Sequence, residues 1–176
     1  LSDVRKSTGT WKEDYSLNGW GFDAPEIMKS YEVIKKMTIE EKIDFWRKVM
    51  AYGKQRNVKF YVVTWNIFVY GIDGKYGITD KLENPVTTDY FRKSVKQMVL
   101  TYPDLAGIGL TTGENMYDYT GIQKEEWAYA TYGQGVLDAM KEQPDRKINF
   151  IHRQHQSKAS EITKIFKGIT ENKNIN

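Results

Sequence analysis

Hydrophobic residues recur along this chain in two alternating patterns. Short apolar runs rich in β-branched and aromatic side chains predict buried strands, and these runs are residues 59–66, 105–111 and 147–153. Longer stretches in which apolar residues return every three or four positions predict amphipathic helices, and these are residues 38–56, 88–102, 123–142 and about 162–169. A strand followed by a helix, repeated three times, predicts an α/β protein with a βαβαβα order and a parallel sheet.

Local chemistry marks several of these boundaries. Thr38 and Glu41 have the spacing of a capping box, which predicts a helix start. The pairs Pro103-Asp104 and Pro144-Asp145 predict the ends of the second and third helices.

The connections predict where function lies. The links after the first two strands, up to residues 88 and 123, are longer than the helix-to-strand links and rich in Gly, Tyr, Asp and Asn. Long loops on one side of a sheet are typical of a working face. Three strands are too few to close a barrel or to fill a doubly wound sheet, and residues 1–37 have the pattern of an opening loop that follows a missing strand. We therefore interpret residues 1–176 as part of a larger domain.

Composition narrows the function classes. The 26 Lys and Arg residues are interspersed with 23 Asp and Glu residues, which does not favour a nucleic-acid partner. No apolar run reaches the roughly 18 residues of a membrane span, so no membrane partner is expected. The absence of cysteine excludes disulfides and thiolate chemistry.

Glu114 is the leading candidate for catalysis. It follows the apolar strand 105–111 in a turn of small residues, and the chemistry of α/β proteins collects at the carboxyl ends of strands. The alternative is an ordinary polar turn that opens the next helix.

Three segments together resemble known enzymes. Residues 18–25 (NGWGFDAP), 63–66 (VTWN) and 102–115 (YPDLAGIGLTTGEN) resemble (β/α)8-barrel glycoside hydrolases, nearest to α-glucuronidase-like proteins. The resemblance covers about residues 15–155. It implies that the chain is a fragment of a TIM barrel, with the remaining strands in the parent chain, and that Glu114 is the general acid of a glycosidase. Many related barrels read Asn-Glu where this chain reads Gly-Glu-Asn.

Glycosidic cleavage needs a second carboxylate as nucleophile or base. Neither of the other strand ends supplies one. Asp23, Asp73 and Asp118 lie in loops that could approach Glu114, but we expect the partner on a missing strand, so that the 176 residues alone are inactive.

The third strand ends with His152, Arg153 and His155. Because side chains alternate along a strand, His152 is expected to point away from Arg153 and His155. Arg153 could hold the acid group of a uronic sugar or pair with an acidic residue of a neighbouring helix. A metal site of His152, His155 and Glu114 is a weaker alternative, and no cofactor is expected.

The remaining candidates suit carbohydrate binding. Trp65 could stack on a sugar ring and Asn66 could bind hydroxyl groups, although only one of the two points to a given side. Trp20 and Asp23 could form a subsite or a loop anchor, and Asn115 adjoins Glu114.

The sequence therefore predicts a glycosidase that acts on a polysaccharide or oligosaccharide, with uronic-acid-containing glycans as one substrate class, in a secreted or periplasmic location. Two rivals remain at this point. One is a non-catalytic sugar-binding barrel, and the other is a metal-dependent sugar isomerase or lyase.

Overall fold

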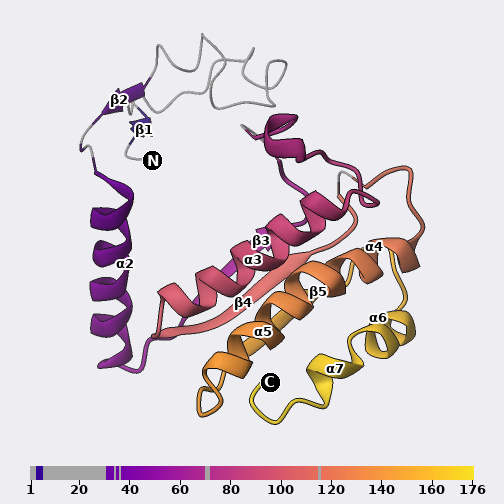
Figure 1. Ribbon diagram of the computed structural model, residues 1–176. Coiled ribbons are helices and arrows are strands. Elements are labelled where there is room, and N and C mark those ends of the chain that lie inside the picture. The colour runs from indigo at the N-terminus through magenta and orange to yellow at the C-terminus, as the bar shows by residue number, and fades with distance from the viewer. Residues whose placement is uncertain (1–2, 6–30, 34, 36, 70–71, 115) are drawn as a thin grey trace. The chain divides into compact units, whose positions relative to one another are not determined.

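The computed structural model describes residues 3–5, 31–33, 35, 37–69, 72–114 and 116–176 (Figure 1). The chain divides into two compact units, Leu1–Phe45 and Trp46–Asn176. In the first unit, β1 (Asp3–Arg5) pairs antiparallel with β2 (Tyr31–Val33), and Arg5 lies opposite Tyr31. The segment predicted as an opening loop thus includes a short strand pair.

Helix α2 (Ile39–Lys54) begins in the first unit and ends in the second. The predicted capping box is confirmed, because the Thr38 amide donates to Glu41 Oε2 at 2.8 Å and the Glu41 amide donates to Thr38 Oγ1 at 3.1 Å. The end of α2 is fixed within the second unit, where Lys54 Nζ lies 2.5 Å from Asp104 Oδ1.

The second unit is built on a three-stranded parallel sheet in the order β3 (Phe60–Trp65), β4 (Leu105–Thr111) and β5 (Asn149–Arg153). Trp65 is in register with Thr111, and Thr111 with Arg153. The prediction of adjacent parallel strands whose ends meet at one edge is confirmed.

The last residues of the chain extend the hydrogen bonding of β5. The Ile148 amide donates to Asn174 O at 2.9 Å and the Asn176 amide donates to Ile148 O at 3.0 Å. Ile148 and Ile175 therefore form a parallel bridge, which occupies the position of a fourth strand.

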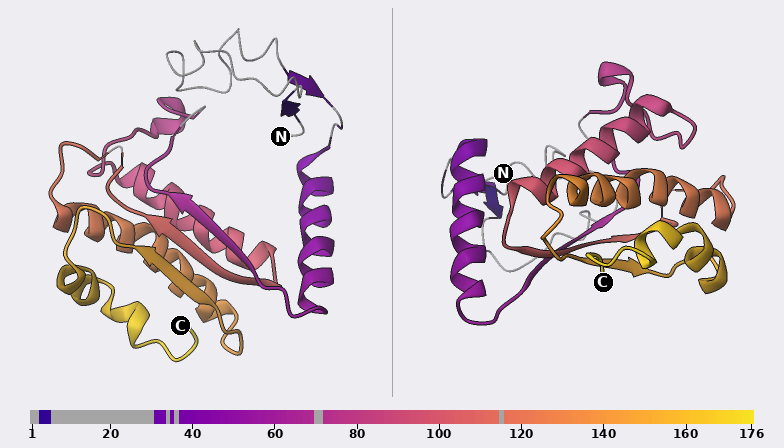
Figure 2. Two further views of the ribbon diagram at one scale, coloured as in Figure 1. Left: turned by 180° about the vertical axis from the view of Figure 1, so that it is seen from behind. Right: turned by 60° about the horizontal axis from the view of Figure 1, so that its bottom comes forward.

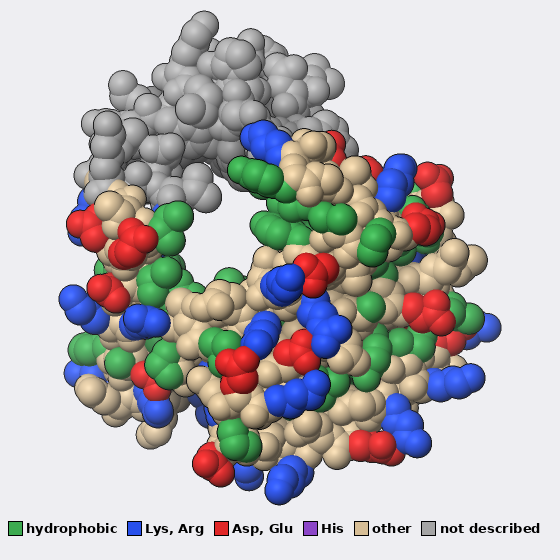
Figure 3. Space-filling model, viewed as in Figure 1, with side chains coloured by type: hydrophobic (Ala, Val, Ile, Leu, Met, Phe, Trp, Pro, Cys, Tyr) green, Lys and Arg blue, Asp and Glu red, His purple; other side chains and the backbone are tan. Residues whose placement is uncertain are grey.

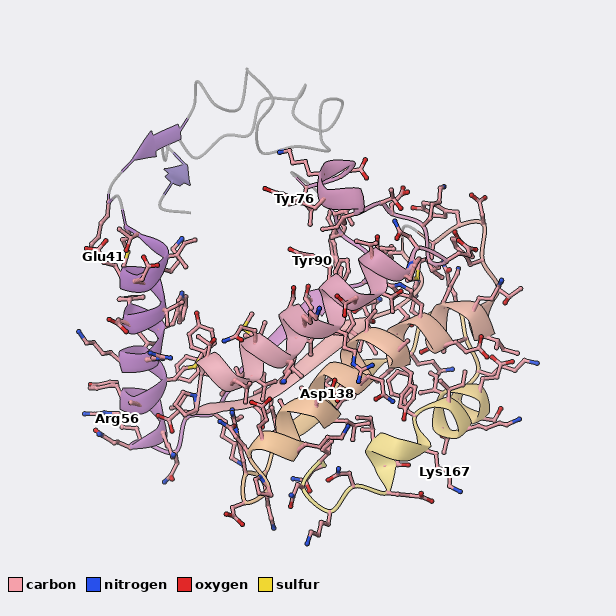
Figure 4. The ribbon with its side chains drawn as sticks, viewed as in Figure 1. Glu41, Arg56, Tyr76, Tyr90, Asp138 and Lys167 are labelled. Carbon is pink, nitrogen blue, oxygen red and sulfur yellow. The ribbon has the colours of Figure 1, made fainter. Side chains whose placement is uncertain are left out.

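The helices that connect the strands lie on one face of this sheet (Figure 2). They are α3 (Pro85–Thr101), α4 (Gly121–Ala128), the π-helix η3 (Tyr129–Gly133) and α5 (Gln134–Glu142), and a short 3₁₀ turn, η2 (Lys75–Gly77), precedes α3. Helices α6 (Ala159–Ile165) and α7 (Lys167–Thr170) follow β5. Ile108 and Leu110 of β4 are buried among Val99, Val136 and other apolar side chains of this layer. Arg92 of α3 and Asp138 of α5 form an ion pair at 2.6 Å (Figure 4).

The helix predicted over residues 123–142 is correct in extent but is not regular. It comprises α4, η3 and α5 in succession. Inside it, the buried Thr131 hydroxyl donates to Trp127 O at 2.8 Å and to Ala128 O at 3.3 Å. A side chain that takes up backbone carbonyls in this way competes with the regular α-helical ladder.

The other face of the sheet is open in the described part of the chain. Tyr61, Val63 and Trp65 alternate along β3, Ile151 lies on β5, and all four side chains are exposed. Asn149 Nδ2 reaches Tyr61 Oη across β4 at 3.3 Å, which shows that the exposed residues of β3 and β5 share one face.

The outer surface differs from this apolar face. Over α3 and α5, basic and acidic side chains are interspersed (Figure 3). None of the described helices is both long enough and apolar enough to pass through a bilayer.

Candidate functional site

The site is built at the carboxyl edge of the sheet, where β4 runs into the turn at Gly113 and Glu114. Gly113 has a φ of 102°, a conformation that residues with a Cβ rarely adopt. A Cβ at this position would lie 3.0 Å from His155 Cδ2 and 3.1 Å from His155 O. Glycine therefore lets the turn pass close to the loop that follows β5.

Glu114 and Arg153 meet at this edge. Arg153 Nη1 lies 3.6 Å from Glu114 Oε1, and the side chains are 57% and 36% exposed, respectively. The pair is a loose, solvent-accessible contact, and exposed pairs of this kind contribute about 0–1 kcal/mol to stability. A ligand can therefore displace one partner at small cost.

An exposed aromatic pair lies beside the end of β3. Trp65 is 53% exposed and Phe68 is 42% exposed, and their ring centroids are 5.8 Å apart with a 39° angle between the planes. Trp65 shares a register row and a sheet face with Thr111 and Arg153. The open face thus ends in an aromatic surface, a guanidinium and a carboxylate.

Asn66 is positioned differently from the sequence hypothesis. Its side chain is fully buried, and Nδ2 donates to the backbone carbonyl of Glu114, while Oδ1 has no hydrogen-bond partner. Asn66 therefore holds the Glu114 turn and does not present its amide on the surface with Trp65.

Tyr132 supports the end of β3 from the helix layer. Its hydroxyl donates to Trp65 O at 2.9 Å and lies 3.4 Å from Asn66 O. Burial raises the pKa of Tyr132 to about 12, so the hydroxyl stays a hydrogen-bond donor over the whole physiological range.

The sequence hypothesis missed Glu125. This fully buried side chain of α4 accepts from Thr112 Oγ1 at 2.7 Å and from Ser157 Oγ at 2.6 Å, and its Oε2 lies 2.6 Å from His152 Nε2. Burial by itself would raise the pKa of Glu125, but the hydrogen bonds from His152, Ser157 and Thr112 lower it below the ordinary value.

The histidines of the third strand end separate as strand alternation predicts. His152 points into the helix layer, where its ring packs edge-on to Phe166 with centroids 5.0 Å apart. Its Nε2 is engaged by Glu125, and its Nδ1 is buried without a partner. His152 therefore does not lie on the face that carries Arg153, whereas His155 lies against the Gly113 turn.

In the described part of the chain, the ion-pair partner of Glu114 is Arg153. Asp73 and Asp118 are exposed. Three predicted site residues, Trp20, Asp23 and Asn115, lie outside the described residues. Within the described ranges, no three His, Cys, Asp or Glu side chains gather in a way that could hold a metal ion.

One sequence signal could have revealed Glu125. It continues the buried stripe formed by Ala128, Tyr132 and Val136, at the spacings of a single helix face. A carboxylate on a core-facing stripe must be paired, and Thr112 and Ser157 in the adjacent loops are suitable donors.

Comparisons of the chain with protein-family models, with curated proteins and with solved structures gave no match. The chemistry of this edge must therefore be argued from its own residues.

Proposed function

We propose that this chain is part of the (β/α)8 catalytic barrel of a glycoside hydrolase, with Glu114 as the general acid. The observation that carries the proposal is the meeting of Glu114 and Arg153 at one sheet edge, on the side where Trp65 and Phe68 expose their rings. Aromatic faces stack on sugar rings, and a positioned carboxyl group can protonate a glycosidic oxygen.

The arrangement of the sheet supports the barrel. The strands follow one another in chain order without a reversal, and α3 and α5 lie on the same face of the sheet. A doubly wound sheet places helices on both faces, whereas a barrel keeps them outside and turns the other face inward. The exposed Val63 and Ile151 suit an inward position that further strands of the parent chain would cover.

Arg153 suggests the kind of sugar. A guanidinium with planar, fixed donors binds a carboxylate with two hydrogen bonds, and its contact with Glu114 is loose enough to be exchanged. Uronic-acid-containing oligosaccharides or polysaccharides therefore fit the site. Such polymers lie outside the cytoplasm, which agrees with a secreted or periplasmic enzyme.

One observation favours a second candidate, a non-catalytic carbohydrate-binding barrel. Hydrolysis needs a second carboxylate, whereas the ion-pair partner of Glu114 in the described part of the chain is the cation of Arg153. The metal-dependent isomerase or lyase is less favoured, because His152 is committed to Glu125 in the helix layer.

The test is Glu114→Gln in the parent protein, with Glu126→Gln of the exposed side of α4 as the matched control. Glutamine keeps the shape of the side chain but cannot donate the proton. We expect cleavage of unactivated glycosides to fall by about 10² to 10⁴, with a much smaller loss for aryl glycosides whose leaving group departs without protonation.

Two results would contradict the assignment. Equal losses of cleavage rate on unactivated and aryl glycosides would show that Glu114 is a nucleophile or a structural residue. Unchanged rates on both would show that Glu114 belongs to an ordinary polar turn. Sugar binding without any turnover in the wild-type protein would favour the non-catalytic barrel.

A further inference from the structure

The buried carboxylate of Glu125 links three segments that surround the candidate site. Thr112 directly precedes the Gly113-Glu114 turn, His152 lies at the end of β5, and Ser157 lies in the loop that follows β5. All three donate to or contact one side chain within 2.7 Å. A single residue of α4 thus joins the loop that carries Glu114 to the segment that carries Arg153.

The hydrogen bonding indicates that this side chain acts as an ionised carboxylate. A carboxylate offers only acceptors, and here it meets two hydroxyl groups and one imidazole. Because His152 Nδ1 is buried without a partner, the network assigns the hydrogen to Nε2, where it is donated to Glu125. The lowered pKa of Glu125 agrees with this arrangement.

The neighbouring residue of α4 makes a parallel contact. Lys124 is buried, and its Nζ donates to Gln156 Oε1 at 2.7 Å. The same Gln156 oxygen would lie 3.2 Å from a Cβ on Gly113. Two adjacent buried side chains therefore hold residues 156 and 157 against the turn that presents Glu114.

We infer that Glu125 is a positioning residue for the candidate active site, which fixes the distance between Glu114 and Arg153 by tying Thr112, His152 and Ser157 together. The inference rests on the proposed function for its kinetic consequence, but its geometric content does not. The carboxylate contacts no open surface, and its action passes through the two loops. Since a displacement of about 1 Å in a catalytic group can cost about 10²-fold in rate, a device of this kind controls kcat.

The kinetic test uses the parent protein with Glu125→Gln, Thr112→Val and Thr112→Ser. Glutamine can keep the oxygen that accepts from Thr112 and Ser157 only by placing its amide NH2 against the Nε2–H of His152, a donor against a donor. Valine removes the Thr112 hydroxyl at nearly constant shape. We expect Glu125→Gln and Thr112→Val to lower kcat by about 10- to 100-fold with little change in KM. Thr112→Ser, which keeps the hydroxyl, should restore most of the rate that Thr112→Val loses.

The second readout does not depend on activity. Amide hydrogen exchange is followed in peptides that cover residues 111–116 and 153–158, in the wild type, in Glu125→Gln and in the control Glu126→Gln. We expect exchange in both segments of Glu125→Gln to accelerate by about tenfold, with no comparable change in β3 or α3. The control should exchange as the wild type does.

The outcomes separate the two ideas. The inference is overturned if amide hydrogen exchange in Glu125→Gln accelerates uniformly over the whole chain. It is also overturned if Thr112→Ser and Thr112→Val lower kcat equally, because Glu125 would then be a general stabilising residue. Unchanged activity in Glu114→Gln would overturn the proposed function, while local acceleration at both loops would still establish Glu125 as the residue that holds them together.

Discussion

At the scale of single residues, the Gly113 turn combines an unusual backbone angle with a close neighbour. Gly74 offers a matched comparison, because its φ is 72° and a Cβ there would meet nothing within 4 Å. We predict that Gly74→Ala costs about 1 kcal/mol of unfolding free energy from the backbone angle alone. Gly113→Ala should cost more, because its Cβ would also press on His155 O.

Urea unfolding of both variants measures these two costs. Equal losses would show that the loop after β5 moves away from Gly113 without penalty. In that case the close approach of the two loops would not restrain the Glu114 turn.

The buried hydroxyl of Tyr132 gives a prediction in alkaline solution. Its pKa is raised from 10.0 to about 12, so between these values the unfolded chain loses the proton while the folded chain keeps it. Stability from this group is complete below pH 10 and falls as the pH rises, by roughly 2 kcal/mol at pH 12. The wild type should therefore lose more unfolding free energy over this range than Tyr132→Phe.

The measurement is urea unfolding at several pH values from 9 upward, because the comparison of the two proteins cancels the titration of other tyrosines and lysines. Parallel curves for the two proteins would mean that Tyr132 ionises as easily in the folded chain as in the unfolded chain.

The sequence predicted the directions of side chains on β5 but not the partners that they find. Alternation along a strand was enough to separate His152 from Arg153. It could not show that His152 meets Glu125, because this contact joins α4 to β5 through the tertiary packing of the helix layer. For the same reason Asn66 was expected at the surface, although it is buried against Glu114 O.

At the scale of elements, α3 begins earlier than its apolar pattern indicated. The structure starts it at Pro85, with Asn84 as the N-cap that accepts from the amides of Val86 and Thr87. Proline in the first turn after a capping Asn is a recognised helix start. The helix was predicted to start at Thr88 from apolar spacing only. Apolar spacing does not reveal a first helical turn whose residues are exposed or polar.

The strands were predicted more closely than the helices. β4 has the bounds that its apolar run predicted, because Leu105, Ile108 and Leu110 are buried in it and glycines occupy two of its remaining positions. The π-helix in the middle of residues 123–142 could not be predicted in this way, since apolar spacing does not record a local change in backbone hydrogen bonding.

Asn84 allows a test of the α3 start. Besides capping, its Nδ2 donates to Gly77 O at 2.8 Å and to Thr79 Oγ1 at 2.9 Å. We predict that Asn84→Ala lowers the unfolding free energy by about 1–2 kcal/mol. Asn84→Asp should lose less, because it keeps the capping acceptor and lacks only the two donated bonds. Equal losses in urea unfolding would show that the cap itself contributes nothing.

At the scale of the whole molecule, the two faces of the sheet differ in how far their apolar side chains are buried. The helix face buries Ile108 and Leu110, and this core exists within the 176 residues. The open face exposes Val63, Trp65 and Ile151, so it gains no comparable burial from the described part of the chain. In the proposed barrel, the middle of this face is interior and only its carboxyl edge, with Trp65 and Arg153, opens to substrate.

This difference gives a direct test of the barrel with Val63→Asp. Val63 is 56% exposed in this chain, and substitutions at exposed positions usually change stability by no more than about 0.5 kcal/mol. We predict a small effect of that size in the isolated 176 residues. In the parent protein the same change would bury an unpaired carboxylate, so it should cost several kcal/mol or prevent folding.

Ile108→Ala is the control, because Ile108 is buried on the helix face. This substitution should lower the free energy of unfolding by about 2–5 kcal/mol in both forms of the protein. Thermal unfolding of both variants, each in the isolated 176 residues and in the parent protein, decides the matter. If Val63→Asp is as harmless in the parent protein as in the 176 residues, the open face stays in water and the sheet does not close. The (β/α)8 barrel would then be wrong, and with it the argument that the second carboxylate lies on a neighbouring strand.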